Sequence, residues 1–196
     1  MEAEKQLNAI RHYVYNIFHN DVTGHDFFHM KRVASLAKYI AKEENANEFI
    51  CEVAAWVHDI GDHKLFADPS RELGKLQDFL TSLDMTKKQI NQILFAVKDV
   101  SYSNGKQFPD TIEGRIVQDA DRIDAIGAIG IARTFAYGGA NNQLIHHNDQ
   151  QHTSIQHFYD KLLKLKNLMH TDTAKEVAQE RHIFMENFLE QFLKEW

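Results

Sequence analysis

Residues 54–63 are Ala54-Ala55-Trp56-Val57-His58-Asp59-Ile60-Gly61-Asp62-His63, an apolar run that ends in a group of His and Asp side chains. Most positions back to Phe49 are also apolar, so the segment is hydrophobic nearly all round. A helix of this kind lies inside a domain with other helices around it, and its polar end is then buried as well. Because an unpaired buried carboxylate is heavily penalised, we expect a divalent cation to satisfy the His and the Asp together.

The composition favours a single all-α domain. The chain has 196 residues, 43% of them hydrophobic, which is enough for one well-buried core without a second domain. Only 2 Pro and 9 Gly argue against long coil linkers, and the alternation typical of strands is nearly absent. We therefore expect one compact helical domain over residues 1–196, with its last helices at about 154–196.

Several features limit the location and the partners of the protein. The single cysteine, Cys51, excludes an internal disulfide, and its place in the apolar helix favours a core residue over a nucleophile. The N-terminus is charged, no apolar h-region follows it, and no stretch approaches the ~18 apolar residues of a membrane span. The formal net charge of -6 disfavours non-specific nucleic-acid binding. We expect a cytoplasmic protein that acts on a small molecule, with no membrane or nucleic-acid partner; its oligomeric state is left open.

Local signals predict where the helices begin and end. Asp26, Asn47 and Asp68-Pro69 are placed to start helices, and Thr86 with Gln89 forms a capping-box pattern. Together with the apolar periodicity, these signals predict helices at about 4–19, 26–45, 47–60, 68–83, 86–100, 111–131, 154–169 and 173–196.

Glycines mark three further features. Gly61 is a natural terminator for the apolar helix. Gly127 and Gly130 fall inside the helix predicted at 111–131, where each costs about 1 kcal/mol relative to alanine, so we expect another backbone to pass close by. Residues 138–153 form a polar, glycine-led insertion that is either a mobile lid or a plain surface loop.

A second histidine shares the inward side of its helix with apolar residues. His29, Val33, Leu36 and Ile40 recur at spacings of four, three and four. This spacing places His29 on the buried stripe, with Arg32 one turn further along.

Three motifs occur in order along the chain: Gly24-His25-Asp26-Phe27-Phe28-His29, His58-Asp59-Ile60-Gly61-Asp62 and Asp119-Ala120-Asp121-Arg122-Ile123-Asp124. They resemble the motifs of the HD superfamily of metal-dependent phosphohydrolases, and their flanks are similar to those of its small single-domain bacterial hydrolases. The resemblance implies an all-α HD fold with a motif core at about 20–137. It also implies one divalent ion (Mn, Mg, Ni, Co or Fe) held by His29, His58, Asp59 and Asp121.

The chemistry of this ligand set agrees with hydrolysis. Two imidazoles and two carboxylates neutralise a divalent ion and leave open positions for a water and a phosphate oxygen. Such an ion lowers the pKa of the bound water and withdraws charge from the phosphoryl group. A purely structural site normally uses Cys-rich tetrahedral sets, and the chain has one Cys. No histidine lies between His63 and His146, whereas the family members with two metals need extra histidines there, so we expect one metal.

Asp62 resembles the acidic residue that handles the proton of the metal water in many members of the superfamily. Helical spacing would place Asp62 on the same side as Asp59, unless Gly61 ends the helix first. The alternative is a helix-end cap or a partner of a ligand histidine. His25, one turn before His29, either contacts phosphate or packs at the helix start.

Three cations adjoin the motifs and suit phosphate oxygens: Arg32, Lys64 and Arg122. Arg122 could equally pair with Asp119 or Asp124. The resemblance favours a nucleoside-triphosphate pyrophosphohydrolase that releases a monophosphate and pyrophosphate. The alternatives are a nucleoside monophosphate phosphatase and a non-catalytic module that binds metal and nucleotide as a sensor.

Overall fold

The structure, a computed structural model, describes residues 2–21, 24–98, 100, 108–150 and 152–196. Over these ranges the chain is all-α, without a strand, and one isolated bridge joins Leu144 and Thr153. Two compact units are formed, by residues 1–120 and residues 121–196. The expected all-α class is confirmed, while the single domain over residues 1–196 stays a prediction.

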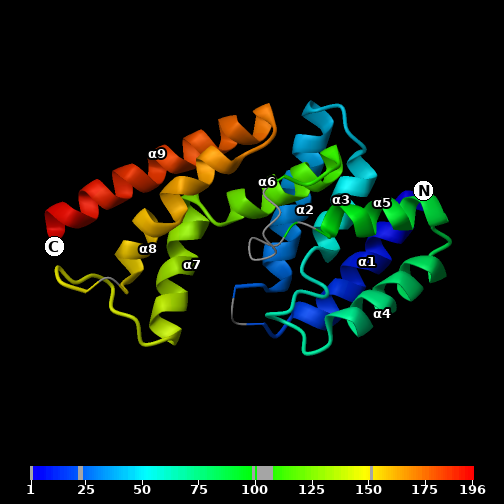
Figure 1. The fold of residues 1–196 in the computed structure, drawn as a ribbon, viewed down its shortest axis with the longest axis horizontal. Coiled ribbons are helices and arrows are strands. Elements are labelled where there is room, and N and C mark those ends of the chain that lie inside the picture. The colour runs from blue at the N-terminus through cyan, green and yellow to red at the C-terminus, as the bar shows by residue number, and fades with distance from the viewer. Residues whose placement is uncertain (1, 22–23, 99, 101–107, 151) are drawn as a thin grey trace. The chain divides into compact units, whose positions relative to one another are not determined.

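The first unit is built around one buried helix. Its elements are α1 (Glu2–Phe18), α2 (Phe27–Glu43), α3 (Glu48–Val57), α4 (Pro69–Ser82), α5 (Lys87–Val97) and most of α6 (Ile112–Asp124). Figure 1 shows α3 among α1, α2 and α5, against which it packs. Every side chain from Ile50 to Val57 is buried, which confirms the prediction for the apolar positions, while the burial of Glu52 was not predicted. Since a fully buried Val or Ile contributes about 1.5–3 kcal/mol, α3 is a main source of the stability of this unit.

Side-chain caps set the starts of the helices in the first unit. Each cap accepts a hydrogen bond from a backbone N–H: Asp26 from His29 (2.7 Å), Asn47 from Ile50 (3.1 Å), Asp68 from Arg71 (3.0 Å) and Thr86 from Gln89 (3.3 Å). These N–H groups have no acceptor within their own helix, so a local side chain fixes where the helix begins. The predicted starts of α2 to α5 are confirmed.

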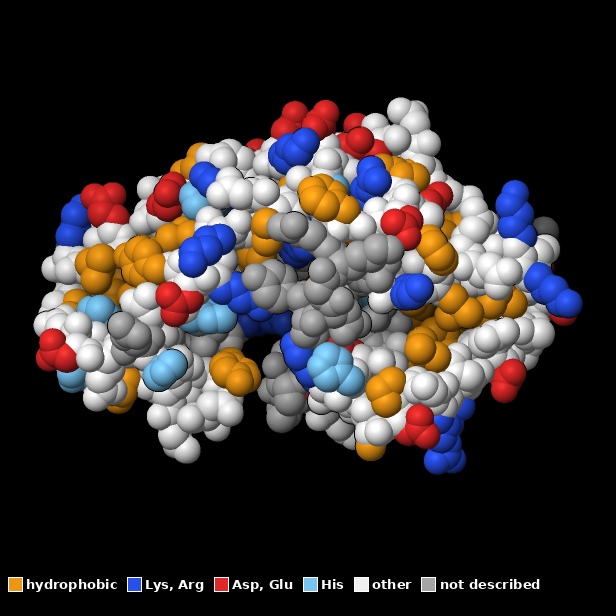
Figure 2. Space-filling model, viewed as in Figure 1, with side chains coloured by type: hydrophobic (Ala, Val, Ile, Leu, Met, Phe, Trp, Pro, Cys, Tyr) orange, Lys and Arg blue, Asp and Glu red, His pale blue; other side chains and the backbone are white. Residues whose placement is uncertain are grey.

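The second unit contains the end of α6 and the C-terminal helices. They are α7 (Gly127–Ala140), α8 (Ser154–Asp160), the 3-10 helix η2 (Leu162–Leu168) and α9 (Asp172–Glu195). In this unit α9 packs against α7 and η2, and α8 packs against the same two elements. Hydrophobic side chains, drawn in orange in Figure 2, also remain at the surface. Phe184 and Trp196 are two exposed hydrophobic residues of this unit. None of the described helices combines the length and the hydropathy that crossing a membrane requires.

The long helix predicted at 111–131 is in fact two helices. α6 ends at Asp124, and α7 begins at Gly127, whose φ of +76° is a conformation that L side chains rarely adopt. Gly130 meets the expected close backbone, because a Cβ there would lie 2.2 Å from the carbonyl oxygen of Ala125. The prediction of a close backbone is therefore confirmed at Gly130, and Gly127 serves the turn instead.

Two other predicted boundaries were wrong. Residues 138–140 belong to the last turn of α7, so the polar insertion begins at Asn141. The single helix predicted at 154–169 is divided into α8 and η2 at Lys161. Both errors arise because the side-chain pattern continues where the backbone changes its hydrogen bonding.

Candidate metal centre and adjoining pocket

The His58-Asp59 pair lies where α3 ends and the chain turns. The helix ends at Val57, and the backbone N–H of Asp62 donates to the carbonyl of Asp59 at 3.1 Å. Gly61 completes this turn with a φ of +88°, which favours glycine. The turn therefore holds His58 and Asp59 at the buried end of α3, as the sequence predicts.

Three imidazoles surround the Asp59 carboxylate. The distances are 2.7 Å from His25 Nδ1 to Oδ2, 3.7 Å from His29 Nε2 to Oδ2 and 3.3 Å from His58 Nε2 to Oδ1. Burial alone would raise the pKa of Asp59, but the charge of His58 and the hydrogen bond from His25 outweigh burial and hold this pKa well below its usual range. Asp59 is therefore an anion, and its oxygens are available as metal ligands.

The donor set fits a divalent metal ion. His58 Nδ1 lies 2.8 Å from the carbonyl oxygen of Ala55, which can only accept, so we assign the ring proton to Nδ1. In the neutral ring Nε2 then carries a lone pair and faces Asp59 Oδ1 at 3.3 Å. Either a proton on Nε2, which gives the charged ring that lowers the Asp59 pKa, or a metal ion relieves the repulsion between these two atoms, and imidazole with carboxylate is a common donor set for divalent transition metals.

Three of the four predicted ligands, His29, His58 and Asp59, come together in the first unit. His29 is buried on the first turn of α2, and its ring contacts that of His58 edge-on with centroids 5.3 Å apart. One ligand atom each of His25, His29 and Asp59 lies within 4.8 Å of the others, so His25 adjoins the same centre. The fourth predicted ligand, Asp121, lies on α6 as the first residue of the second unit, and its ligation stays a prediction.

Asp62 follows the turn closely and lines the adjoining pocket. Its Oδ1 accepts a hydrogen bond from the backbone N–H of Lys64 at 2.8 Å, and its side chain is 10% exposed. The helical spacing assumed from Asp59 does not apply, because α3 ends at Val57. Asp62 thus caps a local turn and faces the pocket as well, and its catalytic role stays a prediction.

The predicted phosphate-binding residues of the first unit differ in their surroundings. His25 is committed to Asp59 through its Nδ1, so any phosphate contact would use the rest of the ring. Arg32 is half-buried on α2, and Lys64 is exposed just past the turn. Their contacts with phosphate stay predictions.

Arg122 has partners within the second unit. Its Nη1 donates to the carbonyl of Leu168 at 2.5 Å and lies 3.1 Å from His170 Nε2. Asp124, one of the ion-pair partners considered for Arg122, accepts a hydrogen bond from Arg133 at 2.8 Å. One nitrogen of the Arg122 guanidinium is therefore engaged in contacts within the second unit. The contact of Arg122 with phosphate stays a prediction.

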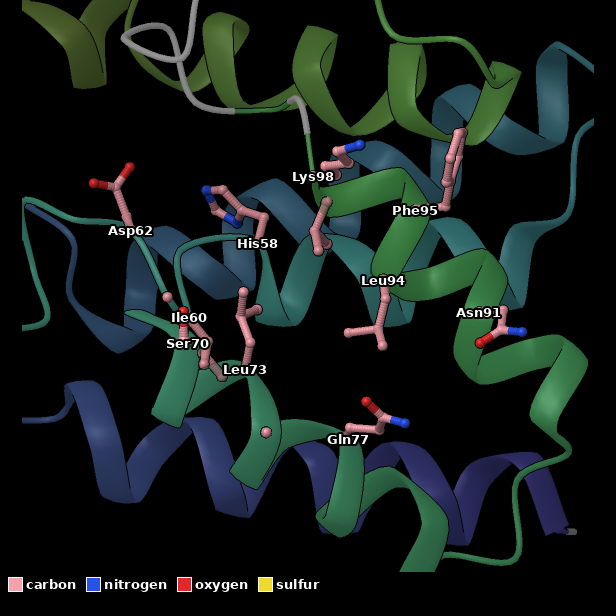
Figure 3. Close-up of a pocket in the computed structure, with 13 residues that line it drawn as sticks. His58, Ile60, Asp62, Ser70, Leu73, Gln77, Asn91, Leu94, Phe95 and Lys98 are labelled. Carbon is pink, nitrogen blue, oxygen red and sulfur yellow. The ribbon is translucent and has the colours of Figure 1, made fainter. Parts of the chain in front are cut away.

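A pocket of about 830 Å³ opens beside His58 and Asp62 in the first unit. Figure 3 shows it bounded by α4 and α5, with aliphatic side chains between the two helices. Its polar lining includes three residues that the sequence did not indicate: Gln77, Asn91 and Lys98. Only their helical faces were predictable, because the approach of α4 to α5 is tertiary.

Comparison with known proteins agrees with this geometry. The HD domain model matches residues 26–126, which include the second and third motifs and the first from Asp26 onward. The Bacillus subtilis protein YpgQ is 41% identical over 198 aligned residues, covering 100% of this chain and 96% of YpgQ. The chain belongs to the HD-domain family.

Solved structures of other HD-domain proteins share the whole fold. The crystal structure of Bacillus subtilis YpgQ in complex with ADP matches with a TM-score of 0.87 at 40% identity, covering 100% of this chain and 97% of YpgQ. An HD-superfamily hydrolase from Bacillus thuringiensis matches with a TM-score of 0.84 at 41% identity, covering 100% of this chain and 98% of that one.

Proposed function

We propose that this HD-domain protein is a metal-dependent phosphohydrolase that cleaves nucleoside triphosphates between the α- and β-phosphates. The observation that carries the proposal is the Asp59 carboxylate, enclosed by imidazoles and next to a pocket that begins at His58 and Asp62. A metal-binding set beside a cavity of ligand size is the arrangement that hydrolysis of a small phosphate compound needs.

The metal would be held by His29, His58, Asp59 and Asp121. Bound there, a divalent ion would lower the pKa of a coordinated water and polarise a phosphoryl oxygen. The chain prepares the ligands: the Ala55 carbonyl fixes the tautomer of His58, and His25 holds one oxygen of Asp59.

The reaction itself is a displacement at the α-phosphorus. The oxygen of a water molecule forms a bond to phosphorus, and the bond to the bridging oxygen breaks, so that its electron pair leaves with pyrophosphate. Asp62 accepts the proton of the water, since it is an acidic residue on the pocket within the same turn as Asp59. The products are a nucleoside monophosphate and pyrophosphate.

Cations around the pocket would balance the charge of the substrate. A triphosphate brings about four negative charges, and a centre already neutralised by Asp59 and Asp121 cannot balance them. Lys98 lines the pocket, and we propose that it acts on the β- and γ-phosphates with Lys64 and Arg32. His25 and Arg122 are the remaining candidates named above for this contact.

Two observations support a nucleotide as the substrate. The related YpgQ, 40% identical to this chain, has been crystallised in complex with ADP. The pocket, at about 830 Å³, lies within the range of roughly 300–1,000 Å³ that small-molecule sites occupy.

Product analysis tests the proposal. The protein is incubated with Mn²⁺ or Mg²⁺ and a panel of nucleoside triphosphates and monophosphates, and the products are separated by ion-exchange chromatography. Monophosphate with pyrophosphate supports the proposal, provided that Asp59→Asn abolishes it and the exposed Asp78→Asn does not. Orthophosphate from a triphosphate, or activity confined to monophosphates, favours a phosphatase. Nucleotide binding without turnover favours a sensor.

A further inference from the structure

We propose that the groove between α4 and α5 is the nucleoside-binding end of the site, and that Gln77 and Asn91 recognise the edge of an adenine base. This inference deepens the proposed function and rests on a nucleotide being the substrate. It assigns a chemical role to a part of the pocket that lies beyond the residues of the metal centre.

The groove has a defined direction along the two helices. On α4, Ser70 lies near the turn that carries Asp62, and Gln77 is two helical turns, about 10 Å, further along. Lys98, the C-cap residue of α5, lines the pocket with His58, and Asn91 lies on α5 two turns earlier (Figure 3). The two carboxamides therefore lie on facing helices at the end of the groove away from the metal centre.

Apolar side chains line the groove between its two polar ends. Leu73 precedes Gln77 by one turn on α4, and Leu94 follows Asn91 by one turn on α5, so each pair shares a helix face. Leu73 remains 36% exposed and Phe95 43% exposed. A flat aromatic base inserted between these walls would remove that apolar surface from water.

The carboxamides supply what the edge of a base requires. Each has an N–H₂ donor and a carbonyl acceptor side by side, and Asn or Gln pairs in this way with the adjacent donor and acceptor of adenine. Within the described part of the chain, neither Gln77 nor Asn91 has a side-chain hydrogen bond, so both amides can turn toward a ligand.

The order of charged, apolar and amide side chains along the groove matches the order of phosphate, sugar and base in a nucleotide. His58, Asp62 and Lys98 lie at one end, aliphatic side chains follow, and Gln77 and Asn91 come last. A nucleotide likewise presents charged phosphates, a sugar, and then a base with apolar faces and a hydrogen-bonding edge.

Leucine variants of the two amides test this inference, because they remove the hydrogen bonds and keep an apolar side chain. Binding of the non-hydrolysable α,β-methylene analogues of ADP and UDP to the metal-loaded protein is measured by calorimetry. Gln77→Leu and Asn91→Leu should each weaken binding of the ADP analogue by about ten-fold or more and remove the preference for adenine over uracil. The matched control is Gln92→Leu on α5, since Gln92 does not line the pocket, and it should leave both affinities unchanged.

Inorganic tripolyphosphate, which has no base, separates base recognition from phosphate binding. Its affinity should be the same in wild type and in both variants. Unchanged affinity for the ADP analogue, or an equal loss for tripolyphosphate, would overturn the inference. These binding measurements do not depend on which phosphate bond is cleaved. If binding depends on the base but the product analysis shows no pyrophosphate, only the proposed reaction is refuted. If pyrophosphate is released but binding does not depend on Gln77 and Asn91, only the base assignment is refuted.

Discussion

His25 Nδ1 lies 2.7 Å from Oδ2 of Asp59, although the two residues are 34 positions apart in the sequence. The imidazole N–H donates to one carboxylate oxygen, while the other oxygen faces His58 Nε2. Such a bond fixes the rotation of a ligand carboxylate, and partners of this kind strengthen metal binding in other sites. His25 is thus placed as a positioning residue for Asp59, whether or not it also touches phosphate.

Removing the His25 ring should weaken metal binding. We expect His25→Ala to raise the Kd for Mn²⁺ by about 10- to 100-fold, because the Asp59 carboxylate loses its hydrogen bond. His25→Asn is the rescue variant, since its carboxamide N–H₂ can replace Nδ1 as donor and should restore most of the affinity. Calorimetric titration with metal measures both. If His25 serves phosphate alone, metal affinity will be unchanged and only KM will rise.

Neutralising Asp62 should separate metal binding from turnover. We expect Asp62→Asn to bind metal normally and to lower kcat by about 10² to 10⁴, the usual effect of losing a positioned proton-transfer group. The asparagine keeps an oxygen for the Lys64 N–H, so the turn is preserved. Steady-state kinetics with metal analysis on the same sample gives the answer. Turnover equal to that of wild type would make Asp62 a structural cap.

The polar insertion should be mobile and should affect substrate choice. Its ends are tied, because Ser154 N–H donates to the Leu144 carbonyl at 2.9 Å and Ile155 N–H to the Ile145 carbonyl at 3.0 Å. We expect amides in 147–150 to exchange with solvent faster than those of α7 and α9. Replacing residues 147–150 by Gly and Ser should change the kcat/KM ratio between substrates. Unchanged ratios would show a plain surface loop.

Cys51 should be unreactive in the folded protein. Burial raises the pKa of its thiol from 9.0 to about 12, and the charge of Glu113 adds to the effect. The unfolded chain ionises first, so the stability linked to this thiol is fully present below pH about 9 and is lost as the pH rises toward about 12. Thiol labelling should therefore require unfolding. As the pH rises above about 9, the denaturation midpoint of wild type should fall more steeply than that of Cys51→Ala. Equal slopes for the two proteins, or rapid labelling of the Cys51 thiol in the folded protein, would contradict this.

Local interactions were the predictable part of this fold. Asp26, Asn47, Asp68 and Thr86 each bond a backbone N–H three residues ahead, so a short window of sequence contains the whole cause. The end of α6 and the start of α7 at Gly127 were not predicted, because apolar residues continue across this position while the φ angle of Gly127 becomes positive. Helical periodicity indicates which side chains share a face, but it does not indicate such a turn of the backbone.

The candidate site likewise has a part that the sequence predicts and a part that depends on tertiary packing. The burial of His29, His58 and Asp59 follows from the apolar surroundings of each residue, which the sequence shows directly. The contact of His25 with Asp59 depends on how α2 packs against α3, and no local pattern encodes it. The amides of Gln77 and Asn91 were missed for the same reason, since each looks like an ordinary polar residue on an amphipathic helix.

Metal stoichiometry tests the central claim most directly. Wild-type protein and the variants His58→Ala and Asp121→Ala are loaded with Mn²⁺, freed of excess metal and analysed by inductively coupled plasma mass spectrometry. His63→Ala, which alters an exposed histidine of the same turn, is the control. We expect one ion per chain in wild type and in the control, and a loss of bound metal in the other two variants. Full retention in both His58→Ala and Asp121→Ala would contradict the metal centre on which the proposed hydrolysis depends.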